Sequence, residues 1–411
     1  MADEDFDVAV IGAGAAGLAA LSRLGELGLN ARAFEARERV GGRAHTLIVE
    51  GVALDLGCGW LHSARQNAWT GVAERLGFVV DRSRPGWTRP PINAAPDEQR
   101  GFRAALAGLE ARIEAAAERE PDAPVSSLYR PADARWRPRL DAFSGYYNGE
   151  AFDAISIHDY AAYQPTNDNW RLRRGYGALI EAFAAGLPIS LSTPVRRLRH
   201  GPAGVTLVTD SAEFSARAAI VALPTSVIAE GGMTFDPPLP DKLEAAADLP
   251  LGHVDKAFLK LPAGARFEPD TRVQGRTDTA QTGGYTLRPM GEPIVEGYFG
   301  GALAQRLEAE GPGAFCAFAR EELAAALGSD FADALEPLAE SRWAADPFSR
   351  GAYSHARPGR AGARAILAAP VEGRIFFAGE ACSPHAFSTA HGAYETGIAA
   401  ATAAAAALQR G

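Results

Sequence analysis

The chain has 411 residues, of which 47% are hydrophobic, 22% are charged and 44 are glycines, so it is long enough for two domains and has the composition of a soluble α/β protein. Its net charge of -9 argues against nucleic-acid binding and mildly favours cationic ligands. The three cysteines, Cys58, Cys316 and Cys382, are too widely spaced for a disulfide framework or a zinc site, which predicts a reducing compartment, the cytoplasm, and no metal.

The start of the chain, MADEDFD, is acidic and lacks the pattern of a signal peptide. No apolar run reaches the length needed to span a bilayer, and the alanine-rich run Ala399–Ala407 is better explained as the end of a buried helix. We therefore expect neither a leader nor a membrane anchor.

A nucleotide-binding pattern follows the first predicted strand, Phe6–Ile11. Gly12, Gly14 and Gly17 have the spacing G-x-G-x-x-G. The first glycine allows a tight turn, the second lets backbone approach a pyrophosphate, and the third lets the next helix pack on the sheet. That helix is predicted from Ala15 to about Gly28, with its N-terminal amides facing the phosphates.

The second predicted strand, Ala31–Phe34, ends on Glu35, whose carboxylate is placed to accept hydrogen bonds from a ribose. Arg39 and Arg43 then enclose two glycines, and arginine suits phosphate oxygens because its fork is planar and bidentate. This R-x-G-G-R run resembles the FAD-dependent amine oxidase superfamily, which carries it after a ribose-binding glutamate. The resemblance implies FAD and not NAD.

The same resemblance extends through Val52–His62, which is similar to the family segment that passes over the flavin. Trp60 and His62 stand where polyamine oxidases have Trp and His. This implies that His62 is a polar group at the mouth of an amine site. The alternative is a surface histidine that follows a strand.

The composition changes between Gly77 and Asn169, where we predict the helical first part of a substrate domain. Gly101–Glu120 reads as an amphipathic helix. Its apolar face carries Phe102, Leu106, Leu109 and Ile113. Tyr146–Tyr163 is rich in acids and aromatic residues, and these acids either bind a cationic substrate or form a solvated face.

The chain then returns to the FAD domain. Asn169–Ile180 resembles a glycine-led turn of the family, and Pro188–Arg199 alternates like a strand. In the family the valine of such a T-P-V run contacts the adenine through its backbone, which implies this role for Val195. The apolar run Ala219–Pro224 is typical of a buried parallel strand.

Gly252–Lys260 begins the second part of the substrate domain, and alternation puts Lys256 and Lys260 on one face of a strand. Leu249–Leu261 resembles the family strand whose lysine reaches the flavin N5 through a water. The resemblance implies this role for Lys256, whereas periodicity alone favours an exposed strand lysine.

Arg342–Ser354 resembles the W…DP…G-x-Y/F stretch of the family. Some monoamine oxidases carry a cysteine just before the aromatic residue, bonded covalently to the flavin. Ala352 stands there in this chain, which implies non-covalent FAD. Tyr353 is then one wall of the aromatic cage around the amine.

The second FAD motif of the family is matched by strand Ile375–Ala378 and by Gly379 and Glu380. A helix after Ser388 is predicted to point its N-terminus at the flavin. Thr389 stands where monoamine oxidases have a second cage tyrosine. Polyamine oxidases and histone lysine demethylases resemble this chain in carrying threonine, which implies a polyamine-like or bulkier substrate.

We therefore predict a two-domain flavoprotein. A Rossmann-like α/β FAD-binding domain is formed by 1–76, 169–248 and 341–411, and an α+β substrate-binding domain by 77–168 and 249–340. The resemblance implies oxidative deamination of an amine by hydride transfer to FAD, reduction of O2 to H2O2, and a monomer or homodimer without nucleic-acid or membrane partners.

Two alternatives remain. An L-amino-acid oxidase needs a cation for the substrate carboxylate, for which Arg171, Arg173, Arg288 and Arg342 are available. A flavoprotein binding module with little turnover needs no catalytic residues.

The implied catalytic residues are Lys256, Tyr353, His62 and Thr389. The predicted cofactor-binding residues are Gly12, Gly14, Ala15, Ala16, Gly17, Glu35, Ala36, Arg37, Gly42, Arg43, Gly59, Trp60, Val195, Trp343, Gly379, Glu380, Thr389 and Ala390.

Overall fold

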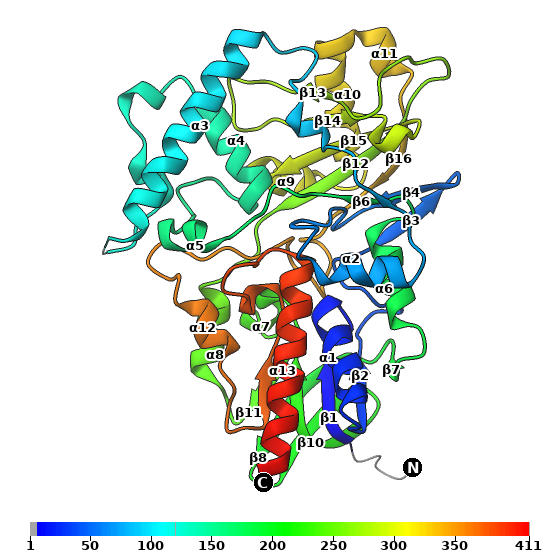
Figure 1. Ribbon diagram of the computed structural model, residues 1–411, viewed down its shortest axis with the longest axis vertical. Coiled ribbons are helices and arrows are strands. Elements are labelled where there is room, and N and C mark those ends of the chain that lie inside the picture. The colour runs from blue at the N-terminus through cyan, green and yellow to red at the C-terminus, as the bar shows by residue number, and fades with distance from the viewer. Residues whose placement is uncertain (1–5, 120, 411) are drawn as a thin grey trace.

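Two β-sheets organise the molecule and lie towards opposite ends of its long axis (Figure 1). The computed structural model describes residues 6–119 and 121–410. Within these residues the larger sheet has eight strands in the order β11-β8-β9-β10-β1-β2-β7, with β17 paired to β10. The strands are β1 (Phe6–Ile11), β2 (Ala31–Phe34), β7 (Ile189–Ser190), β8 (Val195–Gly201), β9 (Gly204–Thr209), β10 (Glu213–Val221), β11 (Thr234–Asp236) and β17 (Ile375–Phe377).

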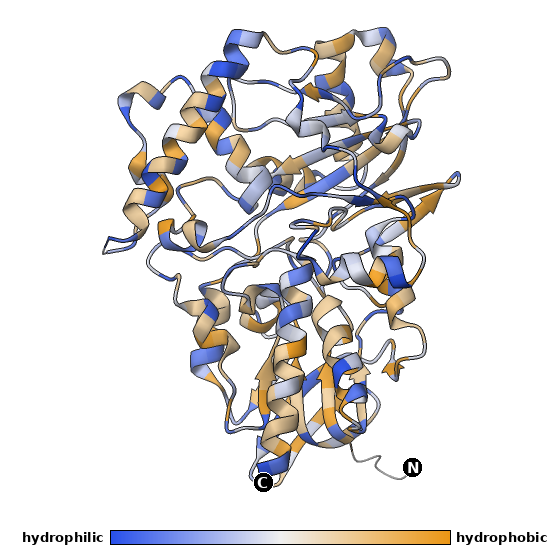
Figure 2. Cartoon of the chain, in the orientation of Figure 1, coloured by the Kyte–Doolittle hydropathy of each residue, from blue (hydrophilic) through white to orange (hydrophobic). Residues whose placement is uncertain are grey.

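The centre of this sheet is parallel, since β1 pairs in parallel with β2 and β10. It is also buried on both faces. Successive side chains of a strand point to opposite faces. Val8 and Val10 therefore join the core beneath helices α1 (Ala15–Glu26) and α13 (Ala390–Arg410), while Ile11 joins the core on the other face. Figure 2 shows these strands and helices in mainly hydrophobic colours.

The smaller sheet is antiparallel, and in the described chain its five strands have the order β13-β14-β15-β12-β16. The strands are β12 (Val254–Lys260), β13 (Thr271–Gln274), β14 (Gly284–Leu287), β15 (Ile294–Gly300) and β16 (Glu336–Glu340). Val295 and Phe299 pack into a core with α9 (Gly301–Glu310) and α10 (Ala314–Leu327). Alternation then directs Glu296 and Tyr298 to the opposite face.

A helical region packs beside this sheet around a small core of its own, which includes Leu109, Ile113 and Phe152. Its helices are α3 (Pro96–Ala117), α4 (Arg137–Asn148) and α5 (Ile157–Ala162). The remaining elements of the described chain are α2 (Ala68–Arg75), α6 (Tyr176–Ala184), α7 (Thr225–Ala229), α8 (Pro240–Ala247), α11 (Ser329–Asp333), α12 (Ala363–Ala368), β3 (Thr46–Val49), β4 (Val52–Asp55), β5 (Val80–Asp81), β6 (Arg171–Leu172) and the 3-10 turns η1 (Gly86–Thr88), η2 (Val125–Leu128), η3 (Pro131–Asp133), η4 (Pro289–Gly291) and η5 (Glu380–Cys382).

One predicted strand is wrong in its extent. Residues 188–199 form two strands, β7 and β8, because Ser192 has a φ of 51° and Pro194 has no backbone N–H to donate to a ladder. The amphipathic helix begins earlier than predicted, at Pro96, a residue favoured at the first helical position. Its predicted end, residue 120, lies outside the described residues, as do residues 1–5 of the acidic N-terminus.

The larger sheet takes its strands from residues 6–34, 189–236 and 375–377, and the smaller sheet from 254–340. The domain limits given above remain a prediction. In the residues described, we find no helix that combines the length and the apolar character needed to cross a membrane.

Candidate active site

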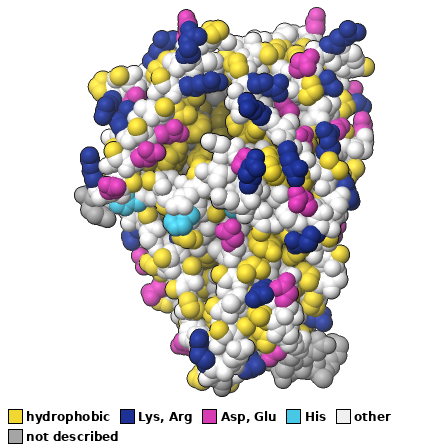
Figure 3. Space-filling view, in the orientation of Figure 1, with side chains coloured by type: hydrophobic (Ala, Val, Ile, Leu, Met, Phe, Trp, Pro, Cys, Tyr) yellow, Lys and Arg dark blue, Asp and Glu magenta, His cyan; other side chains and the backbone are white. Residues whose placement is uncertain are grey.

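A deep cavity between the two sheets brings together residues from both ends of the described chain. It encloses about 1670 Å³, a volume that includes open solvent at its mouth. Its lining runs from the turn after β1 to strands β12 and β15 of the smaller sheet. The face of the molecule drawn in Figure 3 is hollowed in its upper half, near α4 and the smaller sheet, and hydrophobic side chains show inside the hollow.

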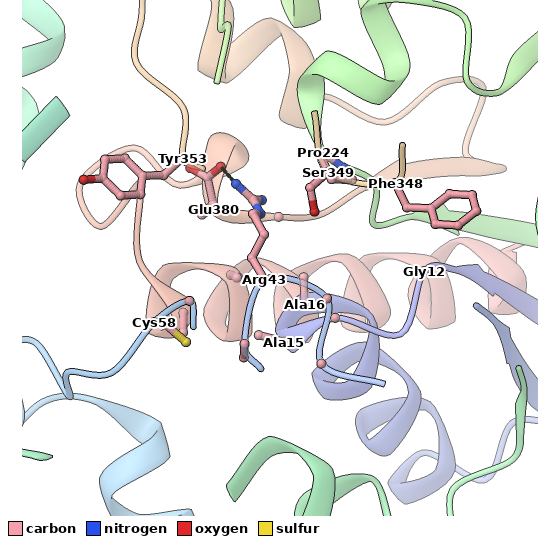
Figure 4. Close-up of a pocket in the computed structure, with 18 of the residues that line it drawn as sticks. Gly12, Ala15, Ala16, Arg43, Cys58, Pro224, Phe348, Ser349, Tyr353 and Glu380 are labelled. Carbon is pink, nitrogen blue, oxygen red and sulfur yellow. Dashed lines mark hydrogen bonds and ion pairs between the residues drawn. The ribbon is translucent and has the colours of Figure 1, made fainter. Parts of the chain in front are cut away.

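One part of the lining, here called the glycine end, follows β1 and β2. Gly12 has a φ of 98°, and a Cβ at this position would lie 2.7 Å from Ala222 O, so only glycine fits. At Gly14 a Cβ would lie 4.0 Å from Gly41 O, and this glycine opens onto the cavity. The first amides of α1, at Ala15 and Ala16, line the same end (Figure 4).

Gly17 was expected to contact the cofactor, but it lies outside the cavity lining. A Cβ there would stand 1.9 Å from Gly12 O. Its function is the close packing of α1 against the turn, so the packing role predicted for the third glycine is the one that the geometry supports.

Glu35, at the end of β2, is 3% exposed and lines the cavity. Its two oxygens accept hydrogen bonds from the backbone N–H of Ala13 at 2.8 Å and of Arg37 at 3.0 Å. A carboxylate oxygen has two lone pairs, so each oxygen retains a free acceptor site. The main chain therefore fixes this carboxylate while leaving it able to bind hydroxyl groups.

The arginines of this region have different roles. Arg43 lines the cavity, forms an ion pair with Glu380 at 2.9 Å and donates to Ala352 O at 2.6 Å. Figure 4 shows it reaching across the cavity wall towards Glu380. Burial by itself raises the pKa of Glu380, but Arg43 and the hydroxyl of Ser354 outweigh burial, and the pKa lies below its ordinary value. Arg39 instead donates to the carbonyls of Val40 and Gly42 and braces its own loop.

The other part of the lining, here called the tyrosine end, contains Lys256, Tyr298 and Tyr353. The Tyr353 hydroxyl donates to Tyr146 O at 2.5 Å and lies 3.3 Å from the Tyr298 hydroxyl. Burial raises the pKa of both hydroxyls, so they stay neutral. Tyr298 was not predicted, although it lies directly opposite Lys256 in the β12–β15 ladder. Only knowledge of that strand pairing can reveal it.

His62 and Trp60 complete this end. The Nδ1 atom of His62 lies 2.7 Å from Asn169 Oδ1, and burial lowers the pKa of the imidazole. Because the amide oxygen only accepts, Nδ1 carries the proton and Nε2 is left as an acceptor. The Trp60 ring contacts the Trp87 ring, with centroids 4.2 Å apart, and the Arg171 guanidinium lies 4.7 Å from its centroid.

Thr389 lines the cavity, but its hydroxyl is already engaged. It donates to Ala386 O at 2.5 Å and accepts the N–H of Gly392 at 3.0 Å, which caps the start of α13. Thr389 therefore forms part of the cavity wall and caps the N-terminus of α13, which begins at Ala390. Trp343 likewise has its indole N–H bonded to Leu56 O at 3.0 Å.

None of the four arginines considered for a substrate carboxylate lines this cavity. Arg171 forms a bidentate pair with Asp270 at 2.6 and 2.8 Å, and Arg173 lies 3.8 Å from Asp81. Arg288 donates to Phe267 O and Arg342 to Glu308 O. The geometry therefore gives no support to an amino-acid oxidase built on these side chains.

With Gly17 set aside, every predicted site residue lines the same cavity. The arrangement fits FAD: Glu35 suits a ribose, the N-terminal amides of α1 suit a pyrophosphate, and those of α13 suit negative charge on a reduced ring. Both helices lie side by side with their N-termini near the centre of the molecule (Figure 1).

Two family models match the chain. The model described as flavin-containing amine oxidoreductase matches residues 97–405, and the model described as NAD(P)-binding Rossmann-like domain matches residues 10–76.

Two sequence relatives and one solved structure match over nearly the whole chain. Polyamine oxidase 4 of Oryza sativa subsp. japonica is 30% identical over 96% of this chain and 87% of its own length. Lysine-specific histone demethylase 1 homolog 2 of Arabidopsis thaliana is 28% identical over 95% of this chain, which spans 57% of that protein. The structure of putrescine oxidase bound to putrescine superposes on this chain with a TM-score of 0.79 at 21% sequence identity. The match covers 97% of this chain and 98% of that one, and it establishes the fold.

Proposed function

The chain belongs to the family of flavin-containing amine oxidoreductases and oxidises an amine with FAD; from this premise we propose that its substrate is polyamine-like and that O2 is reduced to H2O2. The observation that carries the proposal is the tyrosine end of the cavity. An amino-acid substrate needs a guanidinium for its carboxylate, whereas this end offers aromatic rings and Lys256. Thr389 also lies in the wall, at the position where polyamine oxidases resemble this chain in having threonine.

Bound FAD supplies the redox chemistry by accepting a hydride from the carbon next to the amine nitrogen. The protein binds and orients the amine beside the ring of Tyr353, with Tyr298 in the same wall. Burial at this end disfavours an ammonium, so the amine is held in its neutral form, as hydride loss requires. Nε2 of His62 is a free acceptor for a substrate N–H. Water then hydrolyses the iminium product to an aldehyde and a smaller amine.

The experiment that tests this proposal is anaerobic mixing of the yellow protein with a panel of amines, followed through the visible flavin band. The panel contains spermine, spermidine, acetylated polyamines, putrescine, aromatic monoamines and L-amino acids. Bleaching by a polyamine supports the proposal and identifies the substrate. Bleaching by an amino acid alone would overturn it, and no bleaching at all would favour a binding module.

We also propose that FAD is bound without a covalent link. Ala352 occupies the position where some relatives have a linking cysteine, and burial raises the pKa of the nearby Cys58 thiol to about 12, which keeps it from acting as a nucleophile. Acid precipitation should release all of the yellow colour into the supernatant. Colour that stays with the pellet would contradict this. A cytoplasmic location and a monomer or homodimer remain predictions.

A further inference from the structure

Lys256 has two close acceptors in the wall of the cavity. It is 5% exposed, and its Nζ atom lies 3.0 Å from Oε1 of Glu296 and 3.0 Å from the backbone oxygen of Asp55. Glu296 belongs to the strand opposite, two residues before Tyr298, and so projects to the same face of the smaller sheet. The contact is thus a diagonal cross-strand pair, which a simple alternation pattern cannot show.

An ammonium group has three N–H donors and no acceptor. Two donors of Lys256 are used by Glu296 and the backbone oxygen of Asp55, which leaves one for the cavity. A Cβ on Gly59 would stand 3.3 Å from Nζ, so the absence of a side chain at Gly59 keeps the space beside the nitrogen open. Two N–H groups of Lys256 are therefore hydrogen-bonded within the protein, and the third is available to a ligand in the cavity.

Burial opposes a charged lysine, and Glu296 is the nearest compensation. Burial lowers the pKa of Lys256, but the charges of Glu296 and then Asp55 outweigh it, and the pKa lies above its ordinary value. The Asp55 carboxyl is turned to Thr46 and to the N–H of Tyr176, and burial raises its pKa. The other titratable groups that face Lys256 are Cys58, His62 and Tyr298, and Arg272 faces Glu296.

We propose that Glu296 is a positioning residue that keeps Lys256 as an ammonium and directs one of its N–H groups into the cavity, so that the site carries a fixed positive charge. Without this carboxylate, Lys256 would be a buried amine near His62 and the tyrosines, and it would lose its proton at a lower pH. The inference rests on the proposed position of the flavin beside the tyrosine end. Whether Glu296 keeps Lys256 protonated can be tested without any amine substrate.

The chain offers an unusually clean test because it has three lysines, Lys242, Lys256 and Lys260. Lysine labelled with ¹³C and ¹⁵N at its side-chain end, incorporated into the FAD-bound protein, gives one resonance for each, and Lys256→Met assigns the signal of interest. In the unmodified protein Lys256 should stay charged to at least the pH at which free lysine titrates. In Glu296→Gln its titration midpoint should fall by at least one pH unit, a tenfold loss of proton affinity.

A matched control lies on the same strand. Lys260 is 38% exposed at its side chain and pairs with Glu50 at 2.7 Å. Glu50→Gln should leave the Lys256 midpoint unchanged and move that of Lys260 only slightly, since exposed pairs are screened by solvent. If Glu296→Gln does not fold, Glu296→Asp should still shift the Lys256 midpoint in the same direction by less.

An unchanged Lys256 midpoint in a folded Glu296 variant would overturn the proposal, as would an equal shift in Glu50→Gln. A second measurement is the pH dependence of flavin reoxidation by O2 after reduction with dithionite, for which no amine is needed. In Glu296→Gln the rate should begin to fall at the lower pH at which Lys256 loses its proton. The Lys256 titration and the pH dependence of reoxidation could both shift in Glu296→Gln while no amine bleaches the flavin. That result would support the role of Glu296 and reject the proposed substrate class.

Discussion

The two ends of the cavity are built in different ways. The glycine end is made of backbone: amides, tight turns and one carboxylate fixed by two main-chain N–H groups. The tyrosine end is made of side chains from strands and loops far apart in the chain, which hydrogen-bond one another. A site made of backbone tolerates few substitutions at its turns, while a site made of side chains can change its specificity one residue at a time.

A pair of substitutions at the glycine end should give the largest effects and tests whether that end depends on its backbone. Gly12→Ala places a Cβ 2.7 Å from Ala222 O at a φ of 98°, so the turn itself must move and the apoprotein should be destabilised by about 2–4 kcal/mol. Gly14→Ala has room in the apoprotein but projects into the cavity, so it should fold normally and lose FAD.

Thermal unfolding of the apoproteins and the ratio of flavin to protein absorbance separate the two effects. Gly25→Ala is the control: it lies in α1, its added Cβ meets no heavy atom within 4 Å outside its own stretch of helix, and it should be neutral or slightly stabilising. Equal melting temperatures for Gly12→Ala and Gly14→Ala would show that the turn is not the constraint.

Glu35→Ala should give the next largest effect. It removes a carboxylate that accepts from Ala13 and Arg37, and charge-assisted hydrogen bonds of this kind are worth about 1.5–3 kcal/mol each. FAD retention, measured by equilibrium dialysis, should weaken on the order of 100-fold. Glu35→Gln keeps one acceptor oxygen and should weaken retention less. Tight binding in Glu35→Ala would argue against the ribose assignment.

At the tyrosine end, Lys256→Met should keep FAD bound and slow its reoxidation by oxygen at least tenfold, about 1.4 kcal/mol in barrier. The methionine fills the same space without the charge that contacts Glu296. Stopped-flow mixing of the reduced protein with oxygenated buffer measures the rate. The surface variant Lys260→Met serves as the control. Reoxidation kinetics equal to those of the unmodified protein would remove this role.

The smallest effect is expected for Tyr298→Phe, which removes a hydroxyl 3.3 Å from that of Tyr353 but keeps the ring. We expect a change of about two- to fivefold in kcat/KM, whereas Tyr298→Ala removes the wall and should cost at least tenfold, mostly in KM. Steady-state kinetics with the best amine of the panel measures both. Similar losses in the two variants would assign the effect to the hydroxyl and not to the ring.

The same contrast explains what could be predicted from the sequence. Gly12, Gly14 and Glu35 could be predicted because the spacing of their motif lies within residues 12–35. Lys256 was identified through the family resemblance, since its strand pattern also fits an exposed lysine. Tyr298 and Glu296 were missed because only the register of β12 against β15 places them beside Lys256.

Two further details depended on atoms that no pattern contains. Thr389 was predicted as a site residue from the family resemblance, but its hydroxyl bonds to Ala386 and Gly392 follow from the path of the preceding loop. Arg39 has a spacing that suits phosphate binding, yet its guanidinium turns back on its own loop carbonyls. Side-chain direction on a loop is set by the local backbone, which residue spacing does not describe.

The packing of α13 on α1 has a consequence for how the protein is made. A Cβ on Gly397 would stand 2.1 Å from Ala16 O, so the two helices touch through their backbones, and both contribute their N-termini to the cavity. At a synthesis rate of about 5–20 residues per second, α13 leaves the ribosome roughly 20 to 80 s after α1. During that interval the nascent chain has the glycine turn after β1 but not the N-terminus of α13, so the cavity is incomplete until α13 has been synthesised.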